Sequence, residues 1–106
     1  MHIANLRQAR RFASEKMVKA GLFATERLYY DLYCLEPGQS QKVHSHAGSD
    51  KVYLVLEGQA TIAIGSEERN FGPEDAVLAP AGEPHGVRNA TAERLVLLVV
   101  TTPPPK

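Results

Sequence analysis

Turn-forming glycine and proline residues interrupt this chain at short intervals, which leaves space for strands but little for helices. Glycine permits positive φ angles and proline fixes its own φ, so both residue types favour turns. Between the turns lie short apolar segments, and no sustained helical period follows residue 14. The turn signals are Ala20-Gly21, Pro37-Gly38, Glu57-Gly58, Gly65-Ser66, Gly72-Pro73 and Pro80-Ala81-Gly82.

The apolar segments predict an all-β protein. Many short strands at close spacing are typical of an antiparallel sandwich or barrel. At the N-terminus, apolar residues recur at intervals of three from Ile3 to Phe12, which fits either one short helix or a segment draped over the barrel. Consecutive prolines after Thr102 cannot donate to a ladder and end the last strand. The predicted strands cover residues 16–22, 26–35, 41–46, 51–56, 59–64, 75–79, 86–89 and 94–101.

Two of these strands are apolar in a way that requires cover on both faces. The run from Leu95 to Val100 shows no alternation, and Val52, Leu54 and Leu56 form an apolar side of their own strand. The opposite side of that strand carries Lys51, Tyr53, Val55 and Glu57. If this second side faces the lumen of a barrel, the first needs cover from the N-terminal strands or from a partner chain. We therefore expect a homodimer.

Composition narrows the class of protein. The chain has 106 residues, which is the length of one domain, and its 12 basic residues balance its 12 acidic ones. That balance argues against a nucleic-acid-binding protein held by net charge. Cys34 is the only cysteine and is expected to be a buried apolar side chain rather than a nucleophile. With no signal-peptide-like or membrane-spanning apolar run, a soluble cytoplasmic protein is expected.

Two histidine segments are the candidate functional residues. His44 and His46 are two residues apart, so on one strand they would project from the same face. His85 would add a third imidazole from another strand. Three neutral imidazoles suit a divalent transition metal, and zinc, nickel, copper, iron and manganese all accept such ligands. The sequence therefore predicts a metal site without choosing the metal.

In this order and with these turns, the histidine segments resemble the cupin family. Pro80, Gly82, His85 and Asn89 follow the family spacing P-x-G-x-x-H-x-x-x-N. Glu74-Asp75 stands where a Gly-Asp pair is usual, and Val55-Leu56-Glu57-Gly58 resembles the usual Val-Leu-Glu-Gly turn. Gly38, His44 and His46 also occupy family positions. The chain is thus identified as a small, single-domain member of the cupin superfamily.

The resemblance implies a double-stranded β-helix, a jelly-roll barrel of antiparallel strands. A single domain would span residues 1–106, with a barrel core over about 27–100, an N-terminal extension over 1–26 and a proline-rich tail over 101–106. It also implies that His44, His46 and His85 hold the metal inside the barrel. Seven residues before Gly58, however, the glutamate that the family uses as a further ligand is replaced by Lys51.

A protonated lysine beside a divalent cation is costly in a partly dry cavity. Lys51 could tilt outward to solvent, it could lose its proton, or an anion could lie between the lysine and the metal. Asp50 is a further candidate oxygen ligand, although strand alternation points it to the other face. A surface lysine at a decayed metal site is the plain alternative.

The anion option gives a functional hypothesis. A small carboxylate or enolate would bind the metal through oxygen and pair with Lys51, while Tyr53 donates a hydrogen bond to the same ligand. A packed barrel aromatic is the plain alternative for Tyr53. Two classes of protein stay open: a metal-dependent oxygenase, isomerase or decarboxylase, and a non-catalytic module that binds a small molecule or keeps a degenerate metal site.

Overall fold

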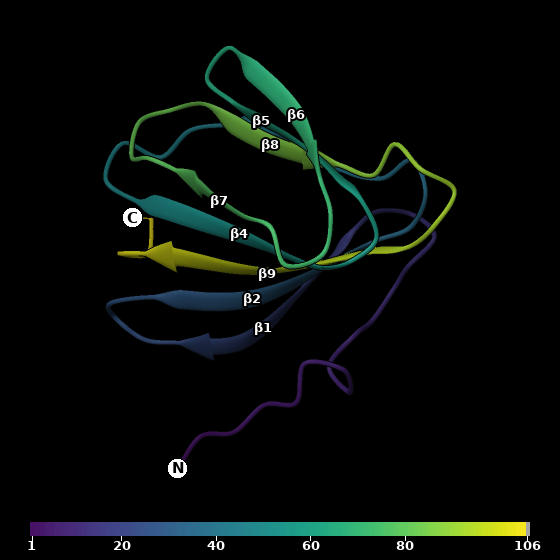
Figure 1. Ribbon diagram of the computed structural model, residues 1–106. Helices are drawn as coiled ribbons and strands as arrows, with labels where there is room; N and C mark the ends of the chain where they lie inside the picture. Colours follow the sequence, from purple (N-terminus) through teal and green to yellow (C-terminus); the bar gives the residue numbers. More distant parts are fainter. Residues whose placement is uncertain (106) are drawn as a thin grey trace.

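The computed structural model describes residues 1–105 and consists of nine strands in two antiparallel sheets. One sheet has the order β1-β2-β9-β4-β7 and the other has the order β3-β8-β5-β6. The two sheets lie face to face (Figure 1). The all-β jelly-roll prediction is confirmed, and no helix of any length occurs in residues 1–105, so none could cross a membrane. The strands are β1 Val18–Ala24, β2 Tyr29–Leu35, β3 Ser40–His44, β4 Asp50–Glu57, β5 Ala60–Ile64, β6 Glu67–Phe71, β7 Ala76–Ala79, β8 His85–Arg88 and β9 Leu95–Thr102.

The main core fills the space between the sheets. On β4 the buried residues alternate as predicted, because Lys51, Tyr53 and Val55 are buried between the sheets while their neighbours on the strand are more exposed. The side of β4 that carries the lysine therefore faces the lumen. Apart from the lysine, the core consists of Tyr33, Leu35, Tyr53, Val55, Ala60, Ile62, Ala79, Val87, Leu95, Leu97 and Val99.

The strand β6 was not among the predicted strands. Four of its five residues are exposed, and its sequence Glu-Glu-Arg-Asn-Phe has no apolar alternation to reveal it. It forms through backbone pairing with β5 at the edge of its sheet. The prediction over 41–46 also ran too far, because β3 ends at His44 and His46 lies in the loop that follows.

A second apolar cluster lies on the outer face of the five-stranded sheet. Leu32, Cys34 and Val96 are fully buried there, with Ala9 and Phe12 of the N-terminal segment packed against them. The N-terminal segment runs as an irregular chain outside this sheet (Figure 1). Of the two alternatives for this segment, the draped form is correct. Its cover is partial, since Leu78 on β7 stays 55% exposed, and the homodimer remains a prediction.

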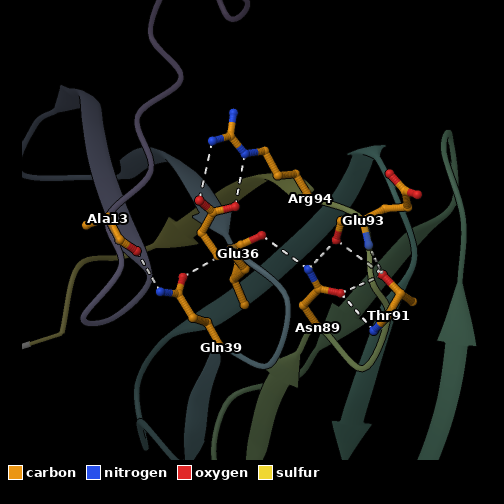
Figure 2. Close-up of polar contacts among 8 residues, drawn as sticks. Ala13, Glu36, Gln39, Asn89, Thr91, Glu93 and Arg94 are labelled. Carbon is orange, nitrogen blue, oxygen red and sulfur yellow. Dashed lines mark hydrogen bonds and ion pairs between the residues drawn. The ribbon is translucent and has the colours of Figure 1, made fainter.

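Asn89, the last residue of the second histidine motif, is a structural cross-link (Figure 2). Its amide nitrogen donates to the carbonyl oxygens of Leu35 at 3.2 Å and Glu93 at 2.7 Å. Its amide oxygen accepts from both the backbone and the hydroxyl of Thr91. The side chain is 1% exposed and ties the end of β2 to the loop between β8 and β9. Beside it, Gln39 donates to the Ala13 carbonyl oxygen and holds the N-terminal segment (Figure 2).

We predict that Asn89→Ala lowers the free energy of unfolding by about 2–3 kcal/mol, because it leaves buried backbone groups without partners. Urea denaturation measures the loss. Asn70→Ala is the matched control, since Asn70 is exposed on β6 and accepts a single side-chain hydrogen bond from Thr61. Equal losses in the two variants would show that the cross-link does not contribute.

Candidate functional site

The three predicted histidines meet in the lumen near one end of the four-stranded sheet. His44 ends β3, His85 begins β8, and the two residues are paired across the sheet. Their ring centroids lie 4.4 Å apart. The ring of His46 lies 4.9 Å from that of His44 and 6.1 Å from that of His85. The sequence prediction that these three imidazoles come together is therefore met by the fold.

The orientation of two of the rings leaves one nitrogen of each directed away from the backbone. Nδ1 of His44 lies 2.8 Å from the Lys42 carbonyl oxygen, and Nδ1 of His85 lies 2.9 Å from the Glu83 carbonyl oxygen. Burial lowers the pKa of both imidazoles, so both are neutral near pH 7. A neutral ring that donates from Nδ1 keeps the lone pair of Nε2 free. Nε2 of His85 is buried and has no hydrogen-bond partner.

His46 is held by its loop rather than by strand pairing. Its carbonyl oxygen accepts from the backbone N–H of Gly82 at 3.0 Å and of Ser49 at 3.4 Å. The Ser49 hydroxyl in turn donates to the Pro103 carbonyl oxygen at 2.6 Å. A cavity of about 310 Å³ lies between this loop and the proline-rich tail. The tail thus forms a wall beside His46.

Lys51 is buried inside the barrel, with only 3% of its surface exposed. Its Nζ lies 3.3 Å from Nε2 of His44 and 3.5 Å from the hydroxyl of Tyr33. Burial, with a smaller contribution from Lys19, lowers the pKa of the ammonium group to about 8, which leaves it mostly protonated at pH 7. The outward tilt and the surface lysine are therefore wrong, because the inward face of β4 holds this side chain in the lumen.

Asp50 lies on the other side of β4 from Lys51, as strand alternation predicted. It is exposed, and its carboxylate accepts from the backbone N–H of Ala81 at 2.8 Å. That hydrogen bond joins β4 to the turn that precedes His85. In this arrangement Asp50 supports the turn and gives no oxygen ligand to the histidines.

Two tyrosines line the lumen beside the lysine. The rings of Tyr33 and Tyr53 lie edge to face with their centroids 6.5 Å apart, and Lys51 Nζ lies 5.9 Å from each centroid. Burial raises the pKa of both phenols, so both remain neutral hydroxyls. The Tyr53 hydroxyl has no hydrogen-bond partner. Tyr53 therefore has the polar atom that the sequence hypothesis gave it and is also a packed aromatic of the core.

Tyr33 and Gln41 are site residues that sequence reasoning missed. Gln41 Nε2 lies 3.3 Å from the Tyr33 hydroxyl, and Gln41 Oε1 is buried with no partner. Neither residue belongs to a histidine motif, and Tyr33 lies in an apolar run that suggested only core packing. Alternation along β2 offered the one available signal, because it places Tyr33 on the same face as Leu35 and Asp31.

The donor set fits a transition metal in its chemistry. Neutral imidazoles that donate their second N–H to a backbone carbonyl are the usual form of histidine ligands, and the unpartnered His85 Nε2 is a free donor atom. In residues 1–105, however, no group of three or more His, Cys, Asp or Glu side chains is arranged so that it could hold a metal ion. The ammonium of Lys51 lies against His44 Nε2 instead.

Comparison with known proteins shows the family. The family model described as a cupin domain matches residues 31–101. A crystal structure of a protein from Thermus thermophilus is 53% identical, covers 99% of this chain and 100% of its own, and has a TM-score of 0.97. An uncharacterized protein from Streptomyces coelicolor is 37% identical over 73 residues, which is 69% of this chain and 68% of that protein.

A sugar phosphate isomerase of the cupin superfamily from Silicibacter pomeroyi is also similar. It is 28% identical with a TM-score of 0.73, and the match covers 79% of this chain but only 57% of the isomerase. The barrel, the two histidine motifs and the family match agree. This chain belongs to the cupin family.

Proposed function

We propose that this cupin binds a divalent transition metal through His44, His46 and His85 and takes a small carboxylate or enolate that pairs with Lys51. The observation that carries the proposal is the Nε2 atom of His85, which is buried without a partner while its ring lies 4.4 Å from that of His44. A buried nitrogen lone pair without a partner is costly unless something binds to it. A metal ion satisfies that lone pair.

The anion follows from the charges in the lumen. With a metal bound, the cation and the Lys51 ammonium would share a nearly dry cavity, and a small anion between them offsets their repulsion. Tyr53 adds an unpartnered hydroxyl that can donate to the same anion. The similarity to a sugar phosphate isomerase is in accord with this proposal, because a sugar phosphate is itself an anion.

The chemistry of such a site would be that of a metal-dependent isomerase, decarboxylase or oxygenase. A bound metal would supply Lewis-acid polarisation of a ligand oxygen, or a site for dioxygen. The protein side chains would orient the ligand: Lys51 would fix its charged end, and Tyr53 would donate a hydrogen bond to it.

A second candidate is a metal-free module that binds an anion without catalysis. It is favoured by the 3.3 Å contact between Lys51 Nζ and His44 Nε2, which uses the lone pair that a metal would need. In this case the Lys51 ammonium group, in place of a metal ion, is the cation inside the barrel. The lysine would still pair with a small carboxylate, so the two candidates share the ligand and differ in the metal.

Elemental analysis separates the two candidates. We expect close to one equivalent of a first-row metal in protein purified without a histidine tag, and its loss in His44→Ala and in His85→Ala. Substitution of His2, which lies outside the lumen in the N-terminal segment, is the control and leaves the metal content unchanged. A wild-type protein without stoichiometric metal would favour the metal-free module. Metal that survives both lumen substitutions would place the ion elsewhere.

A further inference from the structure

The lumen contains more unsatisfied polar atoms than a metal and an anion account for. Gln41 Oε1, the Tyr53 hydroxyl and His85 Nε2 are all buried and have no hydrogen-bond partner. The last two are used by the proposed metal and anion. The amide of Gln41 has no role in that proposal, and a buried amide oxygen without a partner is costly.

Gln41 belongs to a continuous polar chain that ends at the anion site. Its Nε2 lies 3.3 Å from the Tyr33 hydroxyl, and Lys51 Nζ lies 3.5 Å from the same oxygen. The amide and the ammonium are thus two hydrogen bonds apart. That separation suits two polar groups on neighbouring carbons, or one carbon further apart, in a single small ligand.

The amide of Gln41 needs a partner whichever way it is turned. With Nε2 toward Tyr33, the oxygen Oε1 needs a donor; with the amide reversed, Nε2 needs an acceptor. A hydroxyl group both donates and accepts, so it satisfies the amide in either orientation. A methyl group or a hydrogen atom satisfies it in neither.

We propose that the ligand is a hydroxycarboxylate, with its carboxylate on Lys51 and its hydroxyl on the amide of Gln41. This inference rests on the proposed anion site, and it makes Gln41 a specificity-determining residue. Gln41 also borders the outside of the barrel. A groove of about 790 Å³ is bordered by Met17, Lys19 and Gln41, and Lys19 Nζ lies 5.3 Å from the centroid of the Tyr33 ring.

The groove also fits the charge of the ligand. Lys19 is exposed at its edge, while the Nζ of the buried Lys51 lies 5.9 Å from the centroid of the same Tyr33 ring. Asp31 is the acidic group near both amines, and burial raises the pKa of its carboxyl while the two lysines lower it. Glu15 and Lys16 also line the groove. The amines of Lys16, Lys19 and Lys51 thus outnumber the carboxyl groups of Glu15 and Asp31, and this surplus of positive charge favours the approach of an anion.

The test compares acids with and without the hydroxyl. Lactate against propionate, and 3-hydroxybutyrate against butyrate, are titrated calorimetrically into the protein as purified. We expect the hydroxy acid of one pair to bind at least about tenfold more tightly than its partner, because a site built to hydrogen-bond a hydroxyl discriminates strongly against the analogue that lacks it. Gln41→Met, which keeps the side-chain length, is expected to reduce the preference to within about twofold.

Control measurements test whether the loss of preference is specific to Gln41. Gln59→Met alters an exposed glutamine between β4 and β5 and should keep the full preference, and circular dichroism checks the fold of each variant. Equal binding of both acids in the wild type, or a preference that persists in Gln41→Met, would overturn the hydroxyl assignment while leaving the anion site intact. If no acid binds to the wild type, the anion site itself fails and the hydroxyl assignment fails with it.

Discussion

Gly58→Ala is expected to lower the free energy of unfolding by about 4 kcal/mol, the largest stability effect of any single substitution proposed for this barrel. Gly58 has a φ of +84° in the turn between β4 and β5. A Cβ there would overlap the carbonyl oxygen of Arg94 and lie 3.1 Å from the Cα of Leu95. Both obstacles are backbone at the start of β9, the strand between β2 and β4, so no side chain can move to relieve them. Chemical denaturation measures the change.

Gly38→Ala is the matched control for that prediction. Gly38 has the same φ of +84°, but a Cβ at this position meets nothing within 4 Å. Its replacement therefore carries only the cost of a left-handed backbone, about 1–2 kcal/mol. A similar loss in both variants would show that the cost at Gly58 is conformational and that the contact with β9 is irrelevant. The positive φ of the turn would then be the only reason for a glycine at position 58.

Much of the fold could be predicted from the sequence because turn residues and apolar segments act locally. Gly38, Gly58, Gly65 and Gly82 all adopt positive φ, at or beside the places where the sequence predicted turns. The strand β6 could not be predicted in the same way, because its stability comes from pairing with β5 and not from buried side chains of its own. The backbone conformation of Glu74 also could not be predicted from the local sequence.

Glu74 adopts a φ of +75° where the family more often has glycine. Hydrogen bonds around Glu74 hold the turn in this conformation. The backbone N–H of Glu74 donates to the Val55 carbonyl oxygen, and the Asp75 carboxylate accepts from the backbone N–H of Gly72. These contacts fix the turn from both sides, so a side chain that disfavours the conformation is tolerated. The sequence reveals the residue but not the contacts that offset its cost.

The candidate site was predictable where it follows the motifs and not where it depends on strand pairing. The motifs anticipated that His44, His46 and His85 meet, although His46 lies in the loop after β3 and not on the strand. Alternation placed Lys51 and Tyr53 inside the barrel. The irregular pairing of β3 with β8 between Gln41 and His44 could not be anticipated. The contact between Gln41 on β3 and Tyr33 on β2 depends on this tertiary arrangement and not on a local sequence pattern.

Replacing Lys51 with glutamate is expected to increase the affinity for zinc or nickel by at least about 10³-fold. The substitution removes a buried ammonium that lies 3.3 Å from His44 Nε2 and puts a carboxylate in the same place. One pair of unit charges about 4 Å apart is worth about 4 kcal/mol at an effective dielectric constant of 20, which corresponds to about three orders of magnitude in affinity. The carboxylate also supplies the oxygen ligand that the family pattern has there. Competition with a chelator of known affinity measures the change.

Lys51→Met separates the two parts of this effect. It removes the positive charge and keeps much of the side-chain volume, but it adds no ligand, so its metal affinity should lie between those of the wild type and Lys51→Glu. Both variants lose one of the two cations that the anion pairs with and should bind propionate more weakly than the wild type. If Lys51→Glu binds metal no more tightly than the wild type, the lysine does not lie beside the ion. Any metal binding by the three imidazoles would then be independent of Lys51, and the charge argument for an anionic ligand would fail.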